Sequence, residues 1–496
     1  MSKLKIGFAE ESILPGKKIS LSGQFYERIS DVIESPLTVT AMAIEADGEE
    51  AIIVSADIGE TQPYLINLAR EKYVALGGEL DPKKVIIGAT HTHSSHTFAN
   101  PADNIGVTPP FLIIQEYMDG TFYESTAEPD STVMTPIEST ELVTDKIALA
   151  AVRAWAARKN AYVANEFGRA AVGMCRRVTY DDGSAAMWGD ANTANFVALE
   201  GGNDSGIELL YVYDEDQSLI GIVPNIACPA QILGQRDLIS ADYWGRAKAI
   251  IREKLGKDVF FLPLCGAAGD QCPRDLVRWV IPETPIKDPN IKRPNPLKRK
   301  ADPSMYDVSG CTRAGKRVAN EILSVLEEVT DLRDEAVFRH EILSLDLPLR
   351  KVDPTEYREA DAALRALANE AKSGVYNFEN VAKMYVHAGT INRYREQQLK
   401  ETYNAEVHII RLGDIALVTC PFELFLDYGN RLKARSYAEQ TFIMQLSCGR
   451  GGYLPTEKAE KGGHYSAYVA SGNVGHEGGD MMIRIMIDHV NRMFKE

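Results

Sequence analysis

Short apolar segments recur along the first half of the chain, at 51–57, 85–90, 207–214, 219–227 and 259–270. Several of them are apolar throughout, and most end in small or polar residues. Strands that are buried on both faces of a sheet have this composition, whereas strands with one face in water alternate apolar and polar residues. The pattern therefore predicts a largely buried β-sheet.

Helical patterns lie between these segments. Residues 241–255 follow Ser240, a suitable helix N-cap, and precede Gly256, which favours a helix end. Strands that alternate with helices are typical of an α/β fold. We therefore predict an α/β fold with a mixed, largely buried β-sheet covered by helices.

The chain changes character near residue 336. A strand-like segment at 341–349 is followed by an amphipathic helical pattern at 354–372 and by an apolar segment at 407–420. We predict a larger N-terminal unit, residues 1–335, and a smaller C-terminal α/β subdomain, residues 336–496.

Two segments predict exposed loops. Residues 281–305 are rich in proline and lysine, and residues 117–136 are polar. Both are longer than ordinary connections in a compact domain, which indicates lids over a site.

Composition narrows the class of protein. The 496 residues carry 54 Lys and Arg against 70 Asp and Glu, a net charge of −16, and 45% of them are hydrophobic. These values are typical of a globular protein, and the negative charge disfavours nucleic acid as a partner. The sequence shows no signal-like start and no run of 18 apolar residues. We predict a cytoplasmic protein that does not bind membranes and acts on a small molecule, with homo-oligomerisation left open.

Missing motifs disfavour several function classes. The seven cysteines include no C-x-x-C pair, which indicates reduced thiols rather than a disulfide framework or a structural zinc site. The sequence also lacks the P-loop pattern, a G-x-G-x-x-G after a strand, the G-x-S-x-G elbow and the H-E-x-x-H zinc motif. Nucleotide hydrolases, Rossmann dehydrogenases and α/β-hydrolases are therefore disfavoured.

Three of the nine histidines, His91, His93 and His96, lie within six positions directly after the apolar segment at 85–90. If the strand continues, His91 and His93 project in the same direction, so two imidazoles can bind one metal ion. Catalytic groups of α/β enzymes also lie at the carboxyl ends of strands. A hydrogen-bonded turn is the alternative, but three histidines at this place favour a metal or catalytic site.

Two other kinds of site carry H-x-H after a strand. The metallo-β-lactamase fold uses H-x-H-x-D-H, but Ser95 occupies the aspartate position here. Barrel-type amidohydrolases carry H-x-H on their first strand, whereas at least two predicted strands precede His91. Neither pattern fits the sequence well.

The wider sequence around the histidines resembles a known family. GATHTHSS follows IIVSADIG, and ISADYWG, GAAGDQCPR, CPFELF and GGYLPT come downstream in that order. This set is similar to the N-terminal catalytic domain of the neutral/alkaline (non-lysosomal) ceramidase family, with the chain as a divergent, bacterial-type member. The resemblance runs over most of the chain and implies a zinc-dependent amidase that cleaves an N-acyl bond.

The resemblance also implies roles for single residues. His91 matches a zinc ligand of the family, and His93 would lie beside the metal and the substrate. Glu423 matches a second ligand, although Phe422 stands where the family has glycine, and Tyr453 in GGYLPT matches a third. A shell of imidazole and oxygen ligands leaves a position open for water or substrate.

The sequence departs from the family at a further zinc ligand. Pro229 stands where the family has a histidine, and proline cannot bind zinc. Gln231 is the nearest side chain that offers an oxygen, Cys228 offers a softer ligand, and His96 is another candidate to complete the shell. A reshaped ligand set, weak binding and a metal other than zinc all stay open, as does a plain strand-end turn at this place.

A second departure concerns Cys272, which stands where the family has a serine near the metal. It is a candidate nucleophile with His93 as its base, or a buried residue that lines the site. We favour metal-activated water as the nucleophile. Asp270 is either a catalytic carboxylate or a helix cap.

Three further residues are candidate substrate contacts. Arg274 and Arg28 could bind a carboxylate or hydroxyl groups, although isolated arginines more often form surface ion pairs. His476 lies in the glycine-rich segment GHEGG, which allows close approach to a ligand but equally fits a flexible turn.

The sequence as a whole predicts a metal-dependent hydrolase, with Zn²⁺ as the metal, that cleaves a C–N amide bond of a small polar N-acyl compound. His93 would move protons, and Tyr453 or an arginine would stabilise the oxyanion. Ceramide itself is disfavoured, because the chain has no basic amphipathic segment for a membrane surface. The alternatives are a metal-assisted hydrolase or lyase acting on a carbohydrate, and a degenerate binding protein without catalysis.

Overall fold

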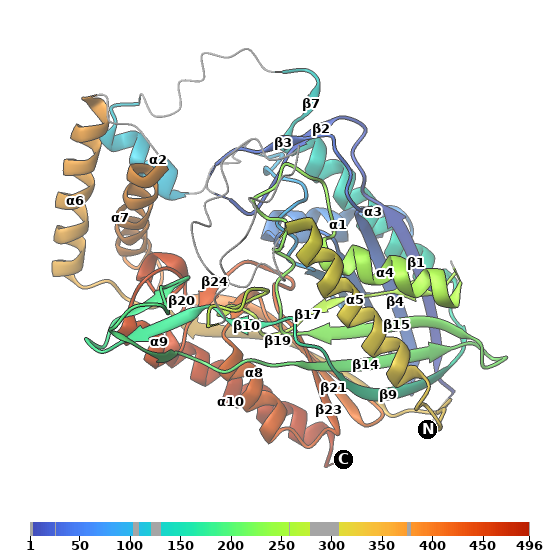
Figure 1. The fold of residues 1–496 in the computed structure, drawn as a ribbon. Coiled ribbons are helices and arrows are strands. Elements are labelled where there is room, and N and C mark those ends of the chain that lie inside the picture. The colour runs from blue at the N-terminus through green and yellow to red at the C-terminus, as the bar shows by residue number, and fades with distance from the viewer. Residues whose placement is uncertain are drawn as a thin grey trace.

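The structure is a computed structural model that describes residues 3–24, 26–102, 109–120, 130–256, 258–277, 307–373 and 378–495. Within these ranges, strands form several mixed sheets, and helices pack on the outer faces of the larger ones (Figure 1). The predicted α/β fold is confirmed, with several packed sheets in place of a single one.

The first sheet has the strand order β6-β5-β4-β1-β8. Most neighbouring strands in it are antiparallel, but β6 runs parallel to β5. Helices α1 and α3 lie on one face of this sheet. The bounds are β1 Lys5–Ser12, β4 Thr38–Ala46, β5 Glu49–Ala56, β6 Val85–Ala89, β8 Lys159–Asn160, α1 Pro63–Ala75 and α3 Pro136–Ala156.

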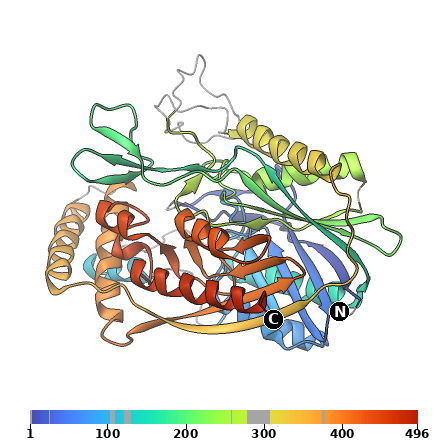
Figure 2. The ribbon, with the colours of Figure 1, turned by 90° about the horizontal axis from the view of Figure 1, so that it is seen from below.

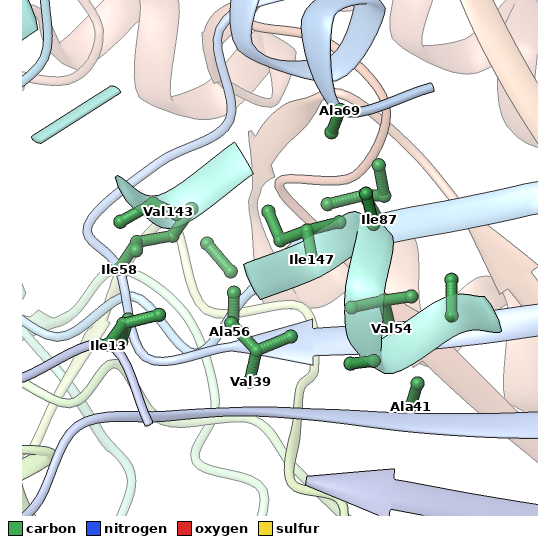
Figure 3. Packing of buried hydrophobic residues seen from close by; sticks show 14 of the residues in the cluster. Ile13, Val39, Ala41, Val54, Ala56, Ile58, Ala69, Ile87, Val143 and Ile147 are labelled. Carbon is green, nitrogen blue, oxygen red and sulfur yellow. The ribbon is translucent and has the colours of Figure 1, made fainter. Parts of the chain in front are cut away.

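Side chains on this sheet alternate between two cores. On β4, Val39 and Ala41 pack in a cluster with Ile147 of α3, whereas Met42 and Ile44 belong to a cluster on the opposite face. Figure 3 shows the first cluster, with Val39 and Ala41 beside the helix that carries Ile147. Apolar side chains on both faces explain why the segments in this sheet are apolar throughout.

Two further sheets pack on the opposite face of the first. One has the order β16-β15-β14-β9, with β17 also beside β15, and the other has the order β19-β20-β21-β23. Helices α4 and α5 pack near the former sheet, and α8 and α10 near the latter (Figure 2). The bounds are β9 Tyr162–Arg169, β14 Gly206–Tyr213, β15 Leu219–Ile226, β16 Phe260–Phe261, β17 Leu264–Cys265, β19 Phe338–Pro348, β20 Thr402–Leu412, β21 Ile415–Thr419, β23 Gln440–Met444, α4 Asp242–Leu255, α5 Asp307–Leu326, α8 Leu426–Arg435 and α10 His476–Met493.

The three sheets share one central core. Met42 of the first sheet, Leu210 of the second, and Ile410 and Phe442 of the third belong to the same buried cluster. Burial of such side chains stabilises the folded state by roughly 1.5–3 kcal/mol each. The division of the chain near residue 336 stays a prediction, although both of its parts contribute to this core.

The residues at the ends of helix α4 predicted its position closely. Helix α4 follows an N-cap at Ala241, and the predicted cap Ser240 accepts a hydrogen bond at 2.8 Å from the backbone N–H of Asp242. The helix ends at Gly256, whose φ is +110°. The single strand predicted at 259–270 is wrong: it is broken into β16 and β17, because Pro263 between them has no N–H for the ladder.

A small helical unit lies beside the sheets, where α2, α6 and α7 share a core of their own (Figure 1). The helix predicted at 354–372 is confirmed as α6, and Asp353 and Glu356 form a capping box at its start. The bounds are α2 Pro109–Tyr117, α6 Pro354–Lys372 and α7 Phe378–Glu396.

The predicted lids fall largely outside the described residues. All of 281–305 lies outside them, as do residues 121–129 of the loop predicted at 117–136. The end of the second loop forms β7 (Val133–Met134), which pairs with β2 (Lys18–Ser20). No described helix combines the length and the apolar composition needed to cross a lipid bilayer.

Candidate active site

Two short parallel strands bring Glu423 and Tyr453 together. β22 (Phe422–Leu424) pairs with β24 (Gly452–Leu454), and Glu423 lies opposite Tyr453 in the register. Side chains of residues that are opposite in a sheet lie on the same face. The carboxylate and the phenol are accordingly close enough for the Glu423 charge to raise the pKa of Tyr453.

His91 reaches the same place from the end of β6. Its backbone is left-handed, with a φ of +62°, which is strained for a residue other than glycine. Thr90 holds this turn, because its N–H donates to the Ala56 carbonyl at 2.9 Å and its hydroxyl donates to Asp57 at 3.2 Å. The turn directs the imidazole so that Nε2 lies 3.3 Å from Oε2 of Glu423.

The hydrogen bonds of His91 leave its Nε2 available. Nδ1 lies 2.5 Å from the carbonyl oxygen of Gly59, which only accepts, so the proton of the neutral ring lies on Nδ1. Nε2 then presents a lone pair to a carboxylate oxygen, and two acceptors so close require a proton or a cation between them. Burial disfavours protonation, but the carboxylate of Glu423 outweighs burial and raises the pKa of His91.

A buried guanidinium lies among the predicted metal ligands. Arg176 follows β10 (Met174–Cys175) and donates to Oε1 of Gln231 at 3.2 Å, to the Tyr453 hydroxyl at 3.3 Å and to the Gly269 carbonyl at 2.9 Å. It also lies 3.9 Å from Oε2 of Glu423. The sequence interpretation missed Arg176, because a single arginine in a strand-like segment carries no local signal of its partners.

Charge balance keeps this site ionised although it is buried. Burial alone would raise the pKa of Glu423, but His91 and Arg176 outweigh burial and hold that pKa below its ordinary value. Burial and the Glu423 carboxylate raise the pKa of Tyr453 well above its ordinary value. Tyr465, also missed from the sequence, places its hydroxyl 3.3 Å from that of Tyr453, and burial raises the pKa of Tyr465 to about 12.

His93 lies beside His91 but has different partners. The two rings are 4.9 Å apart, edge to face, and Nδ1 of His93 lies 3.0 Å from the Gly23 carbonyl. Within the described part of the chain, its buried Nε2 has no hydrogen-bond partner. Burial, with further contributions from His91, Arg28 and Arg176, holds the pKa of His93 well below its ordinary value. The neutral ring therefore offers Nε2 as a proton acceptor.

The glycine that accepts this bond also fixes the space around His93. Gly23 has a φ of +92°, and a Cβ atom there would lie 2.5 Å from Nδ1 of His93. Only glycine combines this backbone conformation with so close an approach.

Two predicted residues, His96 and Arg28, support the chain around the site. His96 is buried, with Nδ1 3.1 Å from the Ser139 hydroxyl and Nε2 2.8 Å from the Ile13 carbonyl. Arg28 is also buried and donates to the backbone carbonyl of His93 at 2.6 Å. Their predicted roles, completion of the metal shell for His96 and substrate contact for both, remain predictions.

Cys272 lies on β18 (Gln271–Cys272), next to β10, which precedes Arg176. Burial raises the pKa of its thiol to about 11, although Arg176 opposes this shift. A thiol that stays protonated is a poor nucleophile, so this environment favours a residue that lines the site. Arg274 lies with its guanidinium carbon 5.0 Å from the centre of the Trp188 ring, and that of Arg176 lies 5.7 Å from the same ring.

His476 lies apart from this group. It is the first residue of α10, and its Nδ1 lies 2.9 Å from Oε2 of Glu460. Its backbone N–H also donates to Oε1 of Glu460 at 2.7 Å. These contacts tie the start of α10 to α9 (Glu457–Gly462), and the substrate contact predicted for His476 remains a prediction.

Asp270 binds the start of helix α8. Its Oδ1 accepts a hydrogen bond at 2.8 Å from the N–H of Leu426, and burial raises its pKa to about 6. At a pH well below the ordinary Asp pKa of about 3.9, the carboxyl is neutral in both the folded and the unfolded protein. As the pH rises toward 6, the unfolded chain ionises more readily than the folded one, so the contribution of this group to stability falls.

We expect Asp270→Asn to remove this fall in stability. Between about pH 4 and 7 the variant should gain on the order of 3 kcal/mol in free energy of unfolding relative to the parent. Urea unfolding of both proteins across this range measures the difference, with the exposed Asp216→Asn as a control. Parallel pH profiles for Asp270→Asn and the parent protein would contradict the prediction.

A different group of side chains also has the composition of a metal site. Within the part of the chain that the structure describes, three His, Cys, Asp or Glu side chains bring their ligand atoms within 4.8 Å of one another at one place only, and these are Glu406, His408 and Cys448. None of them was predicted as a ligand. The chain therefore has a possible metal site of Glu, His and Cys apart from His91 and Glu423.

Comparison with known proteins shows similarity of fold but no match by sequence. No protein-family model matches the chain, and no curated protein matches it by sequence. The crystal structure of neutral ceramidase from Pseudomonas aeruginosa matches with a TM-score of 0.64 and 14% identity, over 99% of this chain and 75% of that chain. A ceramidase complexed with C2 matches with a TM-score of 0.65 and 12% identity, over 100% of this chain and 76% of that chain. This chain therefore shares the fold of these ceramidases.

Proposed function

We propose that this chain is a metal-dependent hydrolase that cleaves the C–N amide bond of a small polar N-acyl compound. The convergence of His91, Glu423 and Tyr453 beside the buried guanidinium of Arg176 carries the proposal. The shared fold adds support, because the two matching structures named above are described as ceramidases.

The donor atoms fit a zinc ion held by three residues. Nε2 of His91 lies 3.3 Å from Oε2 of Glu423, and Tyr453 lies opposite Glu423 on the neighbouring strand. The oxygen of Gln231 is occupied by Arg176, and Pro229 offers no ligand, so we propose a shell without a fourth protein ligand. A zinc ion in such a shell polarises a carbonyl group and lowers the pKa of bound water.

The remaining groups of the site suit the proton transfers of amide hydrolysis. Nε2 of His93 is a neutral acceptor that takes a proton from the attacking water and returns it to the leaving amine. Arg176 is a fixed donor beside Glu423, where it stabilises the negative charge that develops on the carbonyl oxygen. Tyr465 adds a second hydroxyl donor next to Tyr453.

Polar surroundings favour a polar substrate. Arg450, three residues before Tyr453, donates to Glu60 at 2.6 Å, and Gln62 donates to the same carboxylate at 2.6 Å. Charged and amide groups this close to the site favour hydroxyl or amide groups of a substrate over long acyl chains, which would leave the charges without water.

Metal analysis combined with a substrate panel tests this function. We expect zinc in the purified protein, one equivalent of which is lost in His91→Ala and kept in His387→Ala, a half-buried histidine on α7. Incubation with N-acyl amino acids and N-acyl sugars should release free amine from at least one compound in the parent protein, but not in His91→Ala.

Other outcomes support the alternatives. Release of reducing sugar or of an unsaturated product without free amine would favour the carbohydrate-active enzyme. Absence of zinc at His91, with no shift of the melting temperature on zinc addition, would reject the metalloenzyme and favour a binding protein without catalysis.

A further inference from the structure

Glu406, His408 and Cys448 form a group outside the proposed active site. Glu406 and His408 lie on β20, and Cys448 lies between β23 and β24. The ligand atoms of all three lie within 4.8 Å of one another. The His408 side chain is fully buried, Cys448 is 9% exposed, and the Glu406 side chain is 23% exposed, so the group is reached from the side of Glu406.

Both ring nitrogens of His408 have side-chain partners. Its Nδ1 lies 2.9 Å from Nε2 of His340, and its Nε2 lies 3.0 Å from Oε1 of Glu406. Nδ1 of His340 is buried and has no hydrogen-bond partner among the described residues. The Glu406 carboxylate only accepts, so without a metal ion Nε2–H of His408 donates to it and Nδ1 of His408 accepts from Nε2–H of His340. With a metal ion at Nε2, the proton of His408 would lie on Nδ1 and be donated to Nε2 of His340. Histidines that bind metals are oriented in this way through their second nitrogen.

Cys448 is held in a strained conformation beside this histidine. Its φ is +55°, which costs on the order of 1–3 kcal/mol for a residue other than glycine. Its N–H donates to the Ile87 carbonyl at 2.9 Å, and the Ile87 N–H lies 3.5 Å from its sulfur. This pairing with β6 keeps the thiol next to Glu406 and His408.

Arg70 of α1 supplies positive charge at this place. Its guanidinium donates to Glu406 at 2.6 and 3.2 Å and lies 3.5 Å from the Cys448 sulfur. It also donates to the Val85 carbonyl at 3.0 and 3.2 Å, which anchors it on β6. A metal ion between the three ligands would therefore compete with Arg70 for Oε1 of Glu406, while the second oxygen could keep its bond to the guanidinium.

We propose that Glu406, His408 and Cys448 form a second binding site, for a zinc-type divalent ion, with His340 as the residue that orients His408. Thiolate, imidazole and carboxylate together match the ligand preference of Zn²⁺ and of Co²⁺ used in its place. Binding replaces the thiol proton of Cys448 by the metal and releases that proton to water. The ion would join β20 to the segment that leads into β24 and Tyr453.

Cobalt titration distinguishes this site from the one at His91. A thiolate ligand gives Co²⁺ an intense sulfur-to-metal absorption in the near ultraviolet, and the ligands proposed at the first site include no cysteine. We expect this absorption to saturate near one equivalent of Co²⁺ and to disappear when Zn²⁺ is added. It should be lost in Cys448→Ser, which changes only the sulfur, and kept in His91→Ala and in Cys311→Ser, another buried cysteine.

A variant of the competing arginine gives a second measurement. Arg70→Gln removes the cation beside Glu406, so it should bind Co²⁺ at least tenfold more tightly than the parent protein. Absorption that survives in Cys448→Ser would overturn the proposal. So would the lack of this absorption at saturating Co²⁺ in both the folded parent protein and the Arg70→Gln variant. Because the signal depends on Cys448, loss of zinc at His91 does not affect it, and the two sites can fail independently.

Discussion

Replacing Arg176 by glutamine should lower the turnover of amide hydrolysis about 10³-fold, which is about 4 kcal/mol of transition-state stabilisation. The guanidinium is buried and contacts Gln231, Tyr453 and Glu423, so water cannot replace its charge. The zinc content of the variant should not fall, because Arg176 is not a ligand. Removal of its positive charge also removes repulsion of the zinc ion.

The variant Arg176→Lys separates charge from geometry. Lysine keeps the charge, but a single ammonium group cannot reach the partners that the guanidinium contacts with two nitrogens, so we expect an intermediate rate. Turnover and zinc content of both variants, measured with the substrate found in the panel, test this role. A rate close to that of the parent protein in Arg176→Gln would show that Arg176 only fills space.

Replacing the neighbouring Arg177 by methionine should instead destabilise the protein by about 3–5 kcal/mol. Arg177 is fully buried and forms a double ion pair with Glu200, at 2.6 and 3.0 Å. It also donates to the backbone carbonyls of Tyr465 at 3.0 Å and Gly463 at 2.8 Å. Methionine leaves the Glu200 carboxylate buried without its partner, and the segment that carries Tyr465 loses its anchor.

Urea unfolding measures this loss, and two controls show its origin. The double variant Arg177→Met with Glu200→Gln should recover part of the stability, because the unpaired charge is removed as well. Arg365→Met breaks an exposed pair with Asp361 and should change stability by at most about 0.5 kcal/mol. Equal effects of Arg177→Met and Arg365→Met would contradict this role for Arg177.

Sequence patterns predicted single elements better than their arrangement. Strands such as 207–214 were visible because both of their faces are apolar, and helix 354–372 because its apolar positions follow a helical period. The division of the strands among several sheets was not visible, since strand order depends on contacts between distant parts of the chain. The break at Pro263 was missed because the apolar run continues through it.

The candidate site was visible only in part. The resemblance pointed to His91, Glu423 and Tyr453, which lie together in the structure. Period-two alternation suggested that His91 and His93 face one ion, but β6 ends before them and His91 adopts a left-handed conformation. Arg176 and Tyr465 were missed because their environment comes from segments far away in the sequence.

The pairing of β6 with the last part of the chain has a consequence for synthesis on the ribosome. Gly88 of β6 bridges Ser447, which is made roughly 360 residues later. At ~5–20 residues per second, β6 waits roughly 20–70 s for this partner. During that time the edge of the first sheet and the face around Met42 lack the third sheet that later covers them. Nascent chains of this protein should therefore be clients of chaperones that bind exposed strands until translation ends.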